Sequence, residues 1–377
     1  MPPDDFDPAQ ECVEIVEVET AVADLRTCAR ASTGRVRCWG EQLDGEIIGD
    51  DEPAWMAEWL NLELDSVSVG LDVCGRAQGR LGCLEPFSKY EGDPVIDGFD
   101  FGRPVASVAV GHSGACAVLD DGTLRCWGNR SIVGVETNEP LGDDDEPSTV
   151  VLPGAVIGVA LGFDSACAVL DDGQVACWGS DPQCELDEPC GILGVPGSLE
   201  SSTPKLIEMP TAALEVSVGT LAACARLEGG SFTCWGDERL VGRGAGGGNI
   251  GDDETPASLP PLALDQGVEQ VDVGTGAACL LAADGSVRCW GGAPVATPLD
   301  PWGEDVLDPL VVDPIPLPEP AVTISVGYGS ACALGESGSV YCWSGGLGYG
   351  GEDVIGLDPS ITQVQPVPVL DPRCDEP

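Results

Sequence analysis

The stretch ACAVLDDGTLRCWG, residues 115–128, decides the fold, because close variants of it recur along the chain of 377 residues. Seven copies are present, and the first cysteines of successive copies lie 42 to 57 residues apart. Repeats of this length are typical of stacked structural units, none of which can bury its apolar surface alone. The seven cysteine pairs are Cys28 and Cys38, Cys74 and Cys83, Cys116 and Cys126, Cys167 and Cys177, Cys224 and Cys234, Cys279 and Cys289, and Cys332 and Cys342.

Each copy has the pattern of short β-strands. Runs that alternate between apolar and small or polar residues precede the cysteine pairs, such as VASVAVG at 105–111 and VIGVALG at 156–162. The repeated stretch adds two strands around a turn, and a segment rich in Val and Pro, such as STVVLP at 148–153, adds a fourth. No stretch shows sustained helical periodicity. The sequence therefore predicts blades of about four antiparallel strands.

The length of the turn predicts which residues face each other. If Asp120, Asp121 and Gly122 form a three-residue loop with Gly in the left-handed conformation, Cys116 faces Cys126 across the hairpin. The second copy has one residue fewer between its cysteines, and a two-residue loop there again pairs the cysteines. We therefore predict a disulfide within each hairpin. Reduced cysteines in the core are the alternative, whereas the spacing does not match the close pairs of a zinc ribbon.

The remaining cysteines complete the pairing. The count of 18 is even and favours an oxidising compartment. Cys184 and Cys190 form a close pair in an apparent loop insertion, which leaves Cys12 and Cys374. The run at 364–372 resembles an outer strand that no eighth copy follows, so we expect it to complete the first blade and to bring Cys374 near Cys12.

The predicted fold is therefore all-β: a single closed β-propeller domain of seven four-stranded antiparallel blades, with the C-terminal strand completing the first blade. An acidic N-terminal tail occupies residues 1–11. The expected repeats span about residues 16–61, 62–103, 104–153, 154–211, 212–266, 267–319 and 320–370.

The repeated pattern G-x4-C-A-x-x-x-D-G-x-x-x-C-W-G resembles bacterial versions of the regulator of chromosome condensation repeat. The loops IIGDDEP at 47–53, LGDDDEP at 141–147 and NIGDDETP at 249–256 are also similar to the bacterial variety. The resemblance covers residues 16 to 370 and implies a seven-bladed propeller. Its eukaryotic founder binds chromatin and promotes nucleotide exchange on a small GTPase, and one secreted bacterial relative inhibits β-lactamases through a propeller face.

Two further positions of the repeat have structural interpretations. A Trp follows the second cysteine in six copies, where Leu84 replaces it in the second, and we expect these rings to pack between blades. A Gly precedes each repeated stretch, with Ala23 in its place in the first copy, and we expect it to permit a tight bend. The residues concerned are Trp39, Trp127, Trp178, Trp235, Trp290 and Trp343, and Gly111, Gly162, Gly219, Gly274 and Gly327.

Composition restricts the partners and the compartment. Lys and Arg number 16 against 64 Asp and Glu, and the formal net charge of −48 repels nucleic acid. The first residues do not resemble a secretory signal, and no apolar run is long enough for a transmembrane helix. The cysteines nevertheless predict an extracellular, periplasmic or cell-surface monomer whose signal or anchor lies outside this sequence. A cytosolic protein with reduced cysteines is the alternative.

The sequence predicts no catalytic or cofactor-binding residue. His112 is the only histidine, and its place in the repeat indicates a structural role. The glycine-rich run at 242–251 does not match a phosphate-binding loop. Acidic loops are weak candidates for calcium, with a solvated acidic rim as the alternative. Their residues are Asp50, Asp51, Glu52, Asp143, Asp144, Asp145, Glu146, Asp252, Asp253 and Glu254.

The sequence thus favours a non-enzymatic binding or scaffold propeller that recognises a protein or glycan at the cell envelope. The longest variable loops run from Trp127 to Pro147, from Trp178 to Pro204 and from Trp235 to Pro256. Loops of this length tend to carry recognition, so we expect partner contacts on one face. The alternatives are a nucleotide-exchange regulator, which the resemblance implies, and an enzyme that acts at the central opening.

Overall fold

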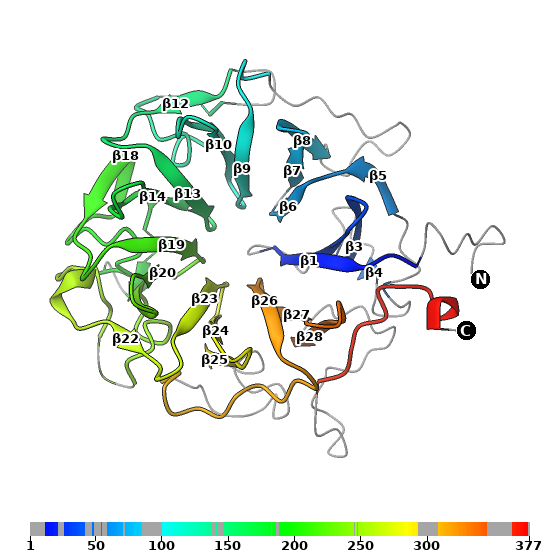
Figure 1. The fold of residues 1–377 in the computed structure, drawn as a ribbon. Coiled ribbons are helices and arrows are strands. Elements are labelled where there is room, and N and C mark those ends of the chain that lie inside the picture. The colour runs from blue at the N-terminus through cyan, green and yellow to red at the C-terminus, as the bar shows by residue number, and fades with distance from the viewer. Residues whose placement is uncertain are drawn as a thin grey trace.

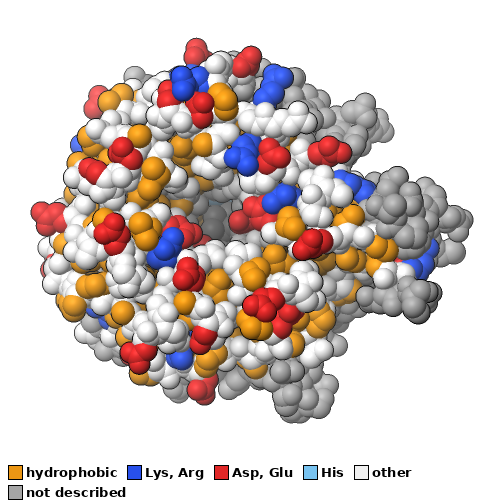
Figure 2. Space-filling view, in the orientation of Figure 1, with side chains coloured by type: hydrophobic (Ala, Val, Ile, Leu, Met, Phe, Trp, Pro, Cys, Tyr) orange, Lys and Arg blue, Asp and Glu red, His pale blue; other side chains and the backbone are white. Residues whose placement is uncertain are grey.

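Seven antiparallel β-sheets stand side by side around a central channel (Figure 1), and the channel is visible as a hollow in the space-filling view (Figure 2). The structure is a computed structural model. It describes residues 12–21, 26–41, 47–48, 54, 59–70, 72–84, 100–137, 140–141, 146–181, 183–185, 188–244, 246, 248–292, 308–344 and 364–375. The molecule is an all-β propeller of seven blades, as the repeats predicted.

Every blade is built from one continuous stretch of sequence, which runs from the channel outward. In the third blade β9 (Val105–Val110) lines the channel, followed by β10 (Gly114–Leu119), β11 (Leu124–Gly128) and the outer β12 (Ser148–Val150). Blade one holds β1 (Ile15–Thr20), β2 (Arg26–Ala31), β3 (Arg35–Glu41), β4 (Ile47–Ile48) and β5 (Trp59–Glu63). Blade two holds β6 (Ser66–Val69), β7 (Val73–Ala77) and β8 (Arg80–Leu84).

The other four blades keep the same order. Blade four holds β13 (Val156–Leu161), β14 (Ser165–Leu170), β15 (Val175–Ser180) and the outer β18 (Glu200–Ile207), with β16 (Gln183–Glu185) and β17 (Glu188–Pro189) as a separate hairpin. Blade five holds β19 (Ala213–Val218), β20 (Ala222–Leu227), β21 (Ser231–Gly236) and β22 (Leu262–Ala263). Blade six holds β23 (Val268–Val273), β24 (Ala277–Ala282) and β25 (Val287–Gly291), and blade seven holds β26 (Ala321–Val326), β27 (Ser330–Gly335) and β28 (Val340–Ser344).

Helical structure is minor in the described part of the chain. Its two named elements are the 3-10 turns η3 (Pro256–Ser258) and η4 (Pro372–Asp375). None of the helices found there has the length and apolar character needed to cross a membrane.

The hairpin registers bring the cysteines together as the turn lengths predicted. Cys116 pairs with Cys126 in the β-ladder, and Cys74 pairs with Cys83 despite the shorter loop. All seven hairpins contain a disulfide, with Cα–Cα distances of 4.0 to 4.1 Å. An eighth disulfide joins Cys12 to Cys374. The expected bridge between Cys184 and Cys190 depends on the Cys184 side chain, which lies outside the described residues.

The glycines before the repeated stretch allow neighbouring blades to approach closely, which differs from the expected role in a bend. A Cβ atom on Gly162 would lie 1.9 Å from the Gly219 carbonyl oxygen, and one on Gly111 would lie 2.5 Å from that of Gly162. None of these glycines has a positive φ. In the first blade Ala21 is the equivalent residue. Its N–H donates to the Arg26 carbonyl at the start of β2, just as the Gly111 N–H donates to the Gly114 carbonyl at the start of β10. The expected Ala23 lies outside the described residues.

The C-terminal run lies in the seventh blade, so the prediction that it completes the first blade was wrong. Pro366 forms a β-bridge with Tyr341, and the Val367 N–H donates to the Val340 carbonyl at 2.7 Å. The reason is that each blade ends with an outer segment from its own stretch of sequence. Residues 364–369 therefore occupy in blade seven the place that β12 occupies in blade three.

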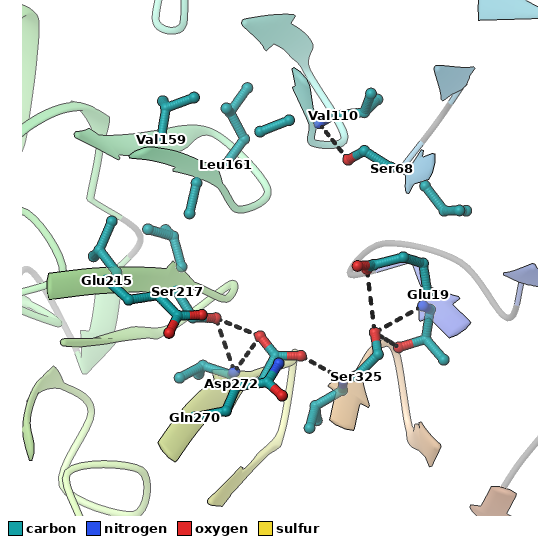
Figure 3. A pocket seen from close by; sticks show the side chains of 18 of the residues that line it. Glu19, Ser68, Val110, Val159, Leu161, Glu215, Ser217, Gln270, Asp272 and Ser325 are labelled. Carbon is teal, nitrogen blue, oxygen red and sulfur yellow. Dashed lines mark hydrogen bonds between the residues drawn. The ribbon is translucent and has the colours of Figure 1, made fainter. Parts of the chain in front are cut away.

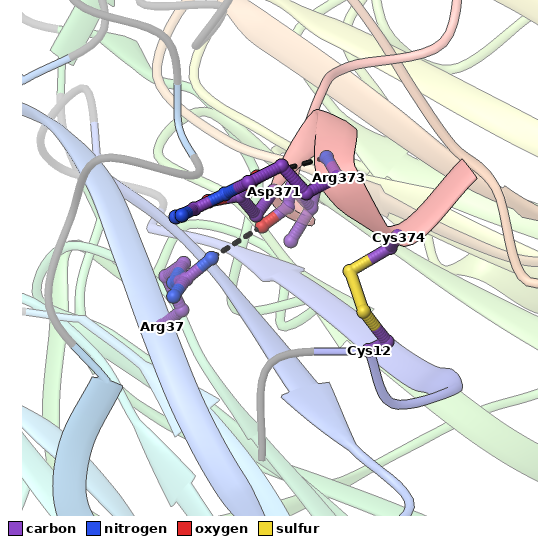
Figure 4. Close-up of a disulfide and its surroundings, with 6 residues drawn as sticks. Cys12, Arg37, Asp371, Arg373 and Cys374 are labelled. Atoms are coloured by element: carbon purple, nitrogen blue, oxygen red, sulfur yellow. Dashed lines mark hydrogen bonds and ion pairs between the residues drawn. A yellow bond between two sulfur atoms is a disulfide. The ribbon is translucent and has the colours of Figure 1, made fainter. Parts of the chain in front are cut away.

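The ring closes through contacts between blades seven and one. The Thr20 N–H donates to Ser325 Oγ at 2.9 Å, which joins β1 to β26 beside the channel. On the outside, the disulfide between Cys12 and Cys374 fastens the two ends of the described chain (Figure 4). Nearby, Arg37 of β3 donates to the Val369 carbonyl at 2.7 Å. We call the disulfide between Cys12 and Cys374 the clasp.

Candidate functional site

The long loops of blades three, four and five all leave the ring on one face. They follow β11, β15 and β21, whose last residues pair with the first residues of β10, β14 and β20. These first residues pair in turn with the last residues of the inner strands β9, β13 and β19. We call this side the loop face, and the opposite side, which carries the tight hairpin turns, the turn face. The described parts of the three loops, residues 129–137, 181–199 and 237–255 with their gaps, form what we call the loop surface.

A tryptophan of the following blade anchors each loop through one of its carbonyl groups. Five of the six recurring tryptophans are almost completely buried, and Trp127 is 7% exposed. The indole N–H of Trp178 donates to the Ile132 carbonyl at 2.7 Å, and that of Trp235 donates to the Ile192 carbonyl at 2.8 Å. Trp290 makes the same bond to Leu240 at 2.7 Å. Each loop is therefore held by the next blade along the ring, as the predicted packing between blades requires.

The loops of blades four and five also contact each other. The Gly197 N–H donates to the Asp252 carbonyl at 2.6 Å, and a Cβ on Gly191 would lie 2.5 Å from the Ile250 carbonyl oxygen. The Asp181 carboxylate accepts the N–H groups of Cys190 and Gly191 at 2.8 and 2.9 Å, and burial raises its pKa to about 6. The part of the loop surface over blades four and five is therefore continuous and held in place by its own contacts.

Three predicted calcium candidates meet in this patch. The carboxylate oxygens of Asp252, Asp253 and Glu254 lie within 4.8 Å of one another. Burial, followed by the hydrogen bond and charge of Asp253, raises the pKa of Glu254 to about 7. Glu146 instead pairs with Arg125 at 2.9 Å. The other candidates, Asp50, Asp51, Glu52, Asp143, Asp144 and Asp145, lie outside the described residues, and calcium binding stays a prediction.

His112 and its surroundings have structural partners. The His112 ring stacks on Phe163 with centroids 4.0 Å apart, at the end of the inner strands. The neighbouring Ser113 hydroxyl donates to Asp164. A cavity of about 360 Å³ adjoins these residues and reaches Trp127 and Asn129. The hydroxyl and the imidazole are thus engaged with different neighbours, which fits the structural role predicted for His112.

The central channel has an acidic side that was not predicted from the sequence. A cavity of about 220 Å³ is lined by the inner strands of all seven blades, and no Lys, Arg or His is among its described lining residues. Glu19, Glu215 and Asp272 line one side, whereas Val159 and Leu161 lie across the channel (Figure 3). The sequence did contain an indication of these acids. In the inner strands, Glu215 of LEVSVG (214–219) and Asp272 of VEQVDVG (268–274) stand where VIGVALG (156–162) has Gly158 and Ala160.

These channel residues also connect blades. The Val326 N–H of β26 donates to Asp272 at 2.6 Å, and the Val273 N–H of β23 donates to Ser217 Oγ at 3.0 Å. Ser217 itself donates to Asp272 at 2.6 Å. The polar side chain near the end of one inner strand thus satisfies a backbone donor of the next blade, which would otherwise be buried without a partner.

The partly buried carboxyl of Glu19, which lines the channel, predicts a pH-dependent stability. Burial, the charge of Asp272 and the charge of Glu17 raise the pKa of Glu19 well above its usual value, and burial also raises the pKa of Asp272 and of Glu215. The folded protein therefore binds the Glu19 proton more tightly than the unfolded chain. This stabilisation is fully present below about pH 4.5 and is lost as the pH rises through the folded pKa.

Replacing Glu19 by Gln should remove this titration while keeping a group that can hydrogen-bond Ser325. We expect the melting temperature of Glu19→Gln to exceed that of the wild type increasingly as the pH rises from 4 to 8. Thermal unfolding across this range measures the difference, with the exposed Glu269→Gln as the control for loss of one charge. If the difference in melting temperature between Glu19→Gln and the wild type were the same at every pH, the raised pKa of Glu19 would be contradicted.

The fold places the chain in the class of seven-bladed β-propellers, and its repeats are similar to those of known proteins. Residues 105–131 and 156–183 match the model of the regulator of chromosome condensation (RCC1) repeat. Over 235 residues, 58% of this chain, it is 31% identical to the E3 ubiquitin-protein ligase HERC2 of Mus musculus. The match spans only 4% of that much longer relative.

Solved structures share the same architecture. Human WBSCR16 superposes with a TM-score of 0.58 at 17% identity, over 94% of this chain and 82% of its own. Prp20p of Saccharomyces cerevisiae superposes with a TM-score of 0.57 at 16% identity, over 94% of this chain and 76% of its own. These similarities establish the fold. HERC2, WBSCR16 and Prp20p are eukaryotic proteins, so the similarity to the bacterial variety of repeat stays a prediction.

Proposed function

We propose that this chain is a non-enzymatic recognition propeller that binds a protein or glycan partner through the loop surface. The observation that carries the proposal is the contact between the loops of blades four and five, through Gly197 and Asp252, on bases that Trp235 and Trp290 anchor. A preorganised patch loses little conformational freedom on binding. The Prp20p structure is described together with its binding to Gsp1p and histones, which supports partner recognition as a use of this fold.

The net charge of the chain restricts the classes of partner that it can bind. A net charge of −48 disfavours nucleic acid and anionic membranes and favours a cationic or neutral partner. Association with a cationic partner should be faster at low salt, because electrostatic steering is screened as ionic strength rises. Nucleotide exchange remains the alternative that the resemblance implies, without a described residue in this chain that favours it.

The disulfides support an oxidising location outside the cytosol. Eight intrachain pairs lie at bonding distance, and such a number is typical of exported proteins. The protein should be isolated from its natural source and unfolded in denaturant without reductant. Titration with a thiol reagent should then detect almost no free thiol. Detection of most cysteines as thiols would place the protein in a reducing compartment.

Substitutions on the loop surface test the binding site without disturbing its anchors. Glu136, Leu199 and Glu238 are exposed side chains of the three loops. We expect Glu136→Lys, Leu199→Ser and Glu238→Lys together to abolish capture of the native partner from solubilised envelope of the source cells, because they reverse the charge that attracts a cationic partner. Asp181 and Ile192, which hold the loops in place, stay unchanged.

The matched control carries Val151→Asp and Val311→Asp, which replace strongly exposed apolar residues away from the loop surface. Equal melting temperatures would show that both variants remain folded. If the same partner were captured by the loop variant and lost by the control, the loop surface would not be the binding site.

A further inference from the structure

A ring of exposed side chains surrounds the channel on the turn face, opposite the loop surface. It consists of the residue five positions before the glycine, or before Ala21, at the end of each inner strand. This residue is exposed in all seven blades. The members are Val16, Asp65, Ala106, Ile157, Leu214, Glu269 and Val322. We call them the bulge ring.

A backbone irregularity exposes most of these side chains. The ladder between the first two strands shifts register at this residue in six blades, as between Val156 and Gly158 or between Ala213 and Glu215. An extra residue in one strand of an antiparallel pair is left unpaired, and its side chain is turned away from the regular pleat. The fold therefore directs this position to solvent whatever residue occupies it.

The apolar character of the ring is not required by the fold. Glu269 occupies the position in blade six, so a charged residue is compatible with the bulge. Yet Ile157, Leu214 and Val322 are 54%, 42% and 53% exposed, and Val16 is 36% exposed. Single exposed apolar residues are ordinary. Here, however, Ile157 and Leu214 stand at the same position of neighbouring blades, as do Val322 and Val16, with Glu269 between the two pairs. Figure 2 shows hydrophobic side chains around the hollow, with acidic side chains among and beyond them.

Acidic side chains flank the ring on its outer side. The hairpin turns of blades four to seven carry the exposed acids Asp171, Asp172, Glu228, Asp284 and Glu336. These turns lie next to the bulges, since the Asp171 N–H donates to the Ala155 carbonyl at 2.8 Å and the Glu228 N–H donates to the Ala212 carbonyl at 2.9 Å. Blades four, five and seven therefore present an exposed apolar residue of the ring beside an acidic turn, whereas blade six presents Glu269 beside its acidic turn.

The channel inside the ring is acidic as well. Glu17 and Glu215 follow Val16 and Leu214 directly, and each pairs with an arginine of its own blade, Arg30 at 2.5 Å and Arg226 at 3.3 Å. Deeper in, Glu19 and Asp272 line the cavity, with no basic residue among the described lining. An apolar rim with carboxylates on both sides is complementary to a segment that combines apolar and cationic side chains.

We propose that the bulge ring is a second binding surface, which receives a cationic, partly apolar segment of a partner protein. The apolar side chains of the partner segment pack on Ile157, Leu214, Val322 and Val16. The Lys or Arg side chains of the segment pair with the turn carboxylates, and one of these cationic side chains reaches toward the channel. A second copy of this strongly acidic chain would be repelled, so charge complementarity favours a cationic partner.

A short synthetic peptide of alternating leucine and lysine tests the surface by isothermal titration with the intact, oxidised protein. We expect binding that weakens as salt rises and that becomes about tenfold weaker in the triple variant Ile157→Ser, Leu214→Ser, Val322→Ser. The matched triple variant Val151→Ser, Leu206→Ser, Val311→Ser removes apolar residues outside the ring that are at least as exposed as Leu214, and it should bind like the wild type.

Two further arms keep the test decisive. A peptide of alternating serine and lysine should bind much more weakly, and Ala106→Ile, which extends the apolar arc without changing charge, should strengthen binding of the leucine peptide. Equal binding of both peptides, or equal binding by the ring variant and the wild type, would overturn the proposal. The loop variant Glu136→Lys, Leu199→Ser, Glu238→Lys should bind the peptide normally, which separates this surface from the loop surface.

Discussion

Removing the clasp with Cys12→Ser and Cys374→Ser together should lower the free energy of unfolding by roughly 3 kcal/mol more than removing a hairpin disulfide with Cys116→Ser and Cys126→Ser. A disulfide stabilises mainly by restricting the unfolded chain, and this effect grows with the logarithm of the loop that it closes. The clasp joins residues separated by 362 positions, whereas a hairpin disulfide joins residues separated by 10.

Chemical denaturation of the two double variants measures this difference, and replacing both partners avoids leaving an unpaired thiol. The clasp also keeps the two ends near Arg37, so its loss should expose the seam between blades seven and one. Faster hydrogen exchange at the Thr20 amide, relative to that of Val273, would report this opening. A larger loss of stability in the hairpin variant would show that the ring closes through β1 and β26 without help from the clasp.

Gly162→Ala should destabilise the protein by about 3 kcal/mol, because the new methyl group would overlap the backbone of the next blade. The Cβ atom would lie 1.9 Å from the Gly219 carbonyl oxygen, which belongs to backbone and cannot rotate away. The blades would have to separate at this seam, which would weaken the packing between them along the inner strands.

Gly158→Ala on the same strand is the control, since a Cβ there has no neighbour within 4 Å. We expect its free energy of unfolding to change by less than about 1 kcal/mol. Thermal and urea unfolding of both variants would compare them directly. Similar stability of the two variants would mean that the inner strands adjust freely. The glycines at the ends of the inner strands would then not set the distance between blades.

Much of the fold was predictable because it depends on local distances along the chain. The loop length between Cys116 and Cys126, and the compensating deletion between Cys74 and Cys83, determine the hairpin register and therefore the cross-strand disulfides. The number of blades follows from the number of copies. Packing of the recurring tryptophans between blades was also predictable, since a repeated large apolar residue must meet the same neighbour each time.

The candidate site was predictable only in part. The long loops could be located by their length, but their anchoring depends on bonds such as that from Trp235 to the Ile192 carbonyl, 43 positions away in sequence. Contact of Gly197 with Asp252 likewise joins two loops whose mutual position is set by the angle between blades. Such contacts leave no local pattern, because either partner alone would suit an ordinary surface loop.

By itself, the sequence determined the repeat, the strand pattern, the cysteine partners within hairpins and the strong negative charge. Only the tertiary structure decided that residues 364–369 complete blade seven, that the glycines face carbonyls of the next blade, and that Glu19 and Asp272 share one channel. The physical reason is that hairpin register is set by covalent connections of about ten residues, whereas seams, closure and the channel arise from packing between blades. That packing brings together residues that are far apart in sequence, and its result depends on the geometry of the whole ring.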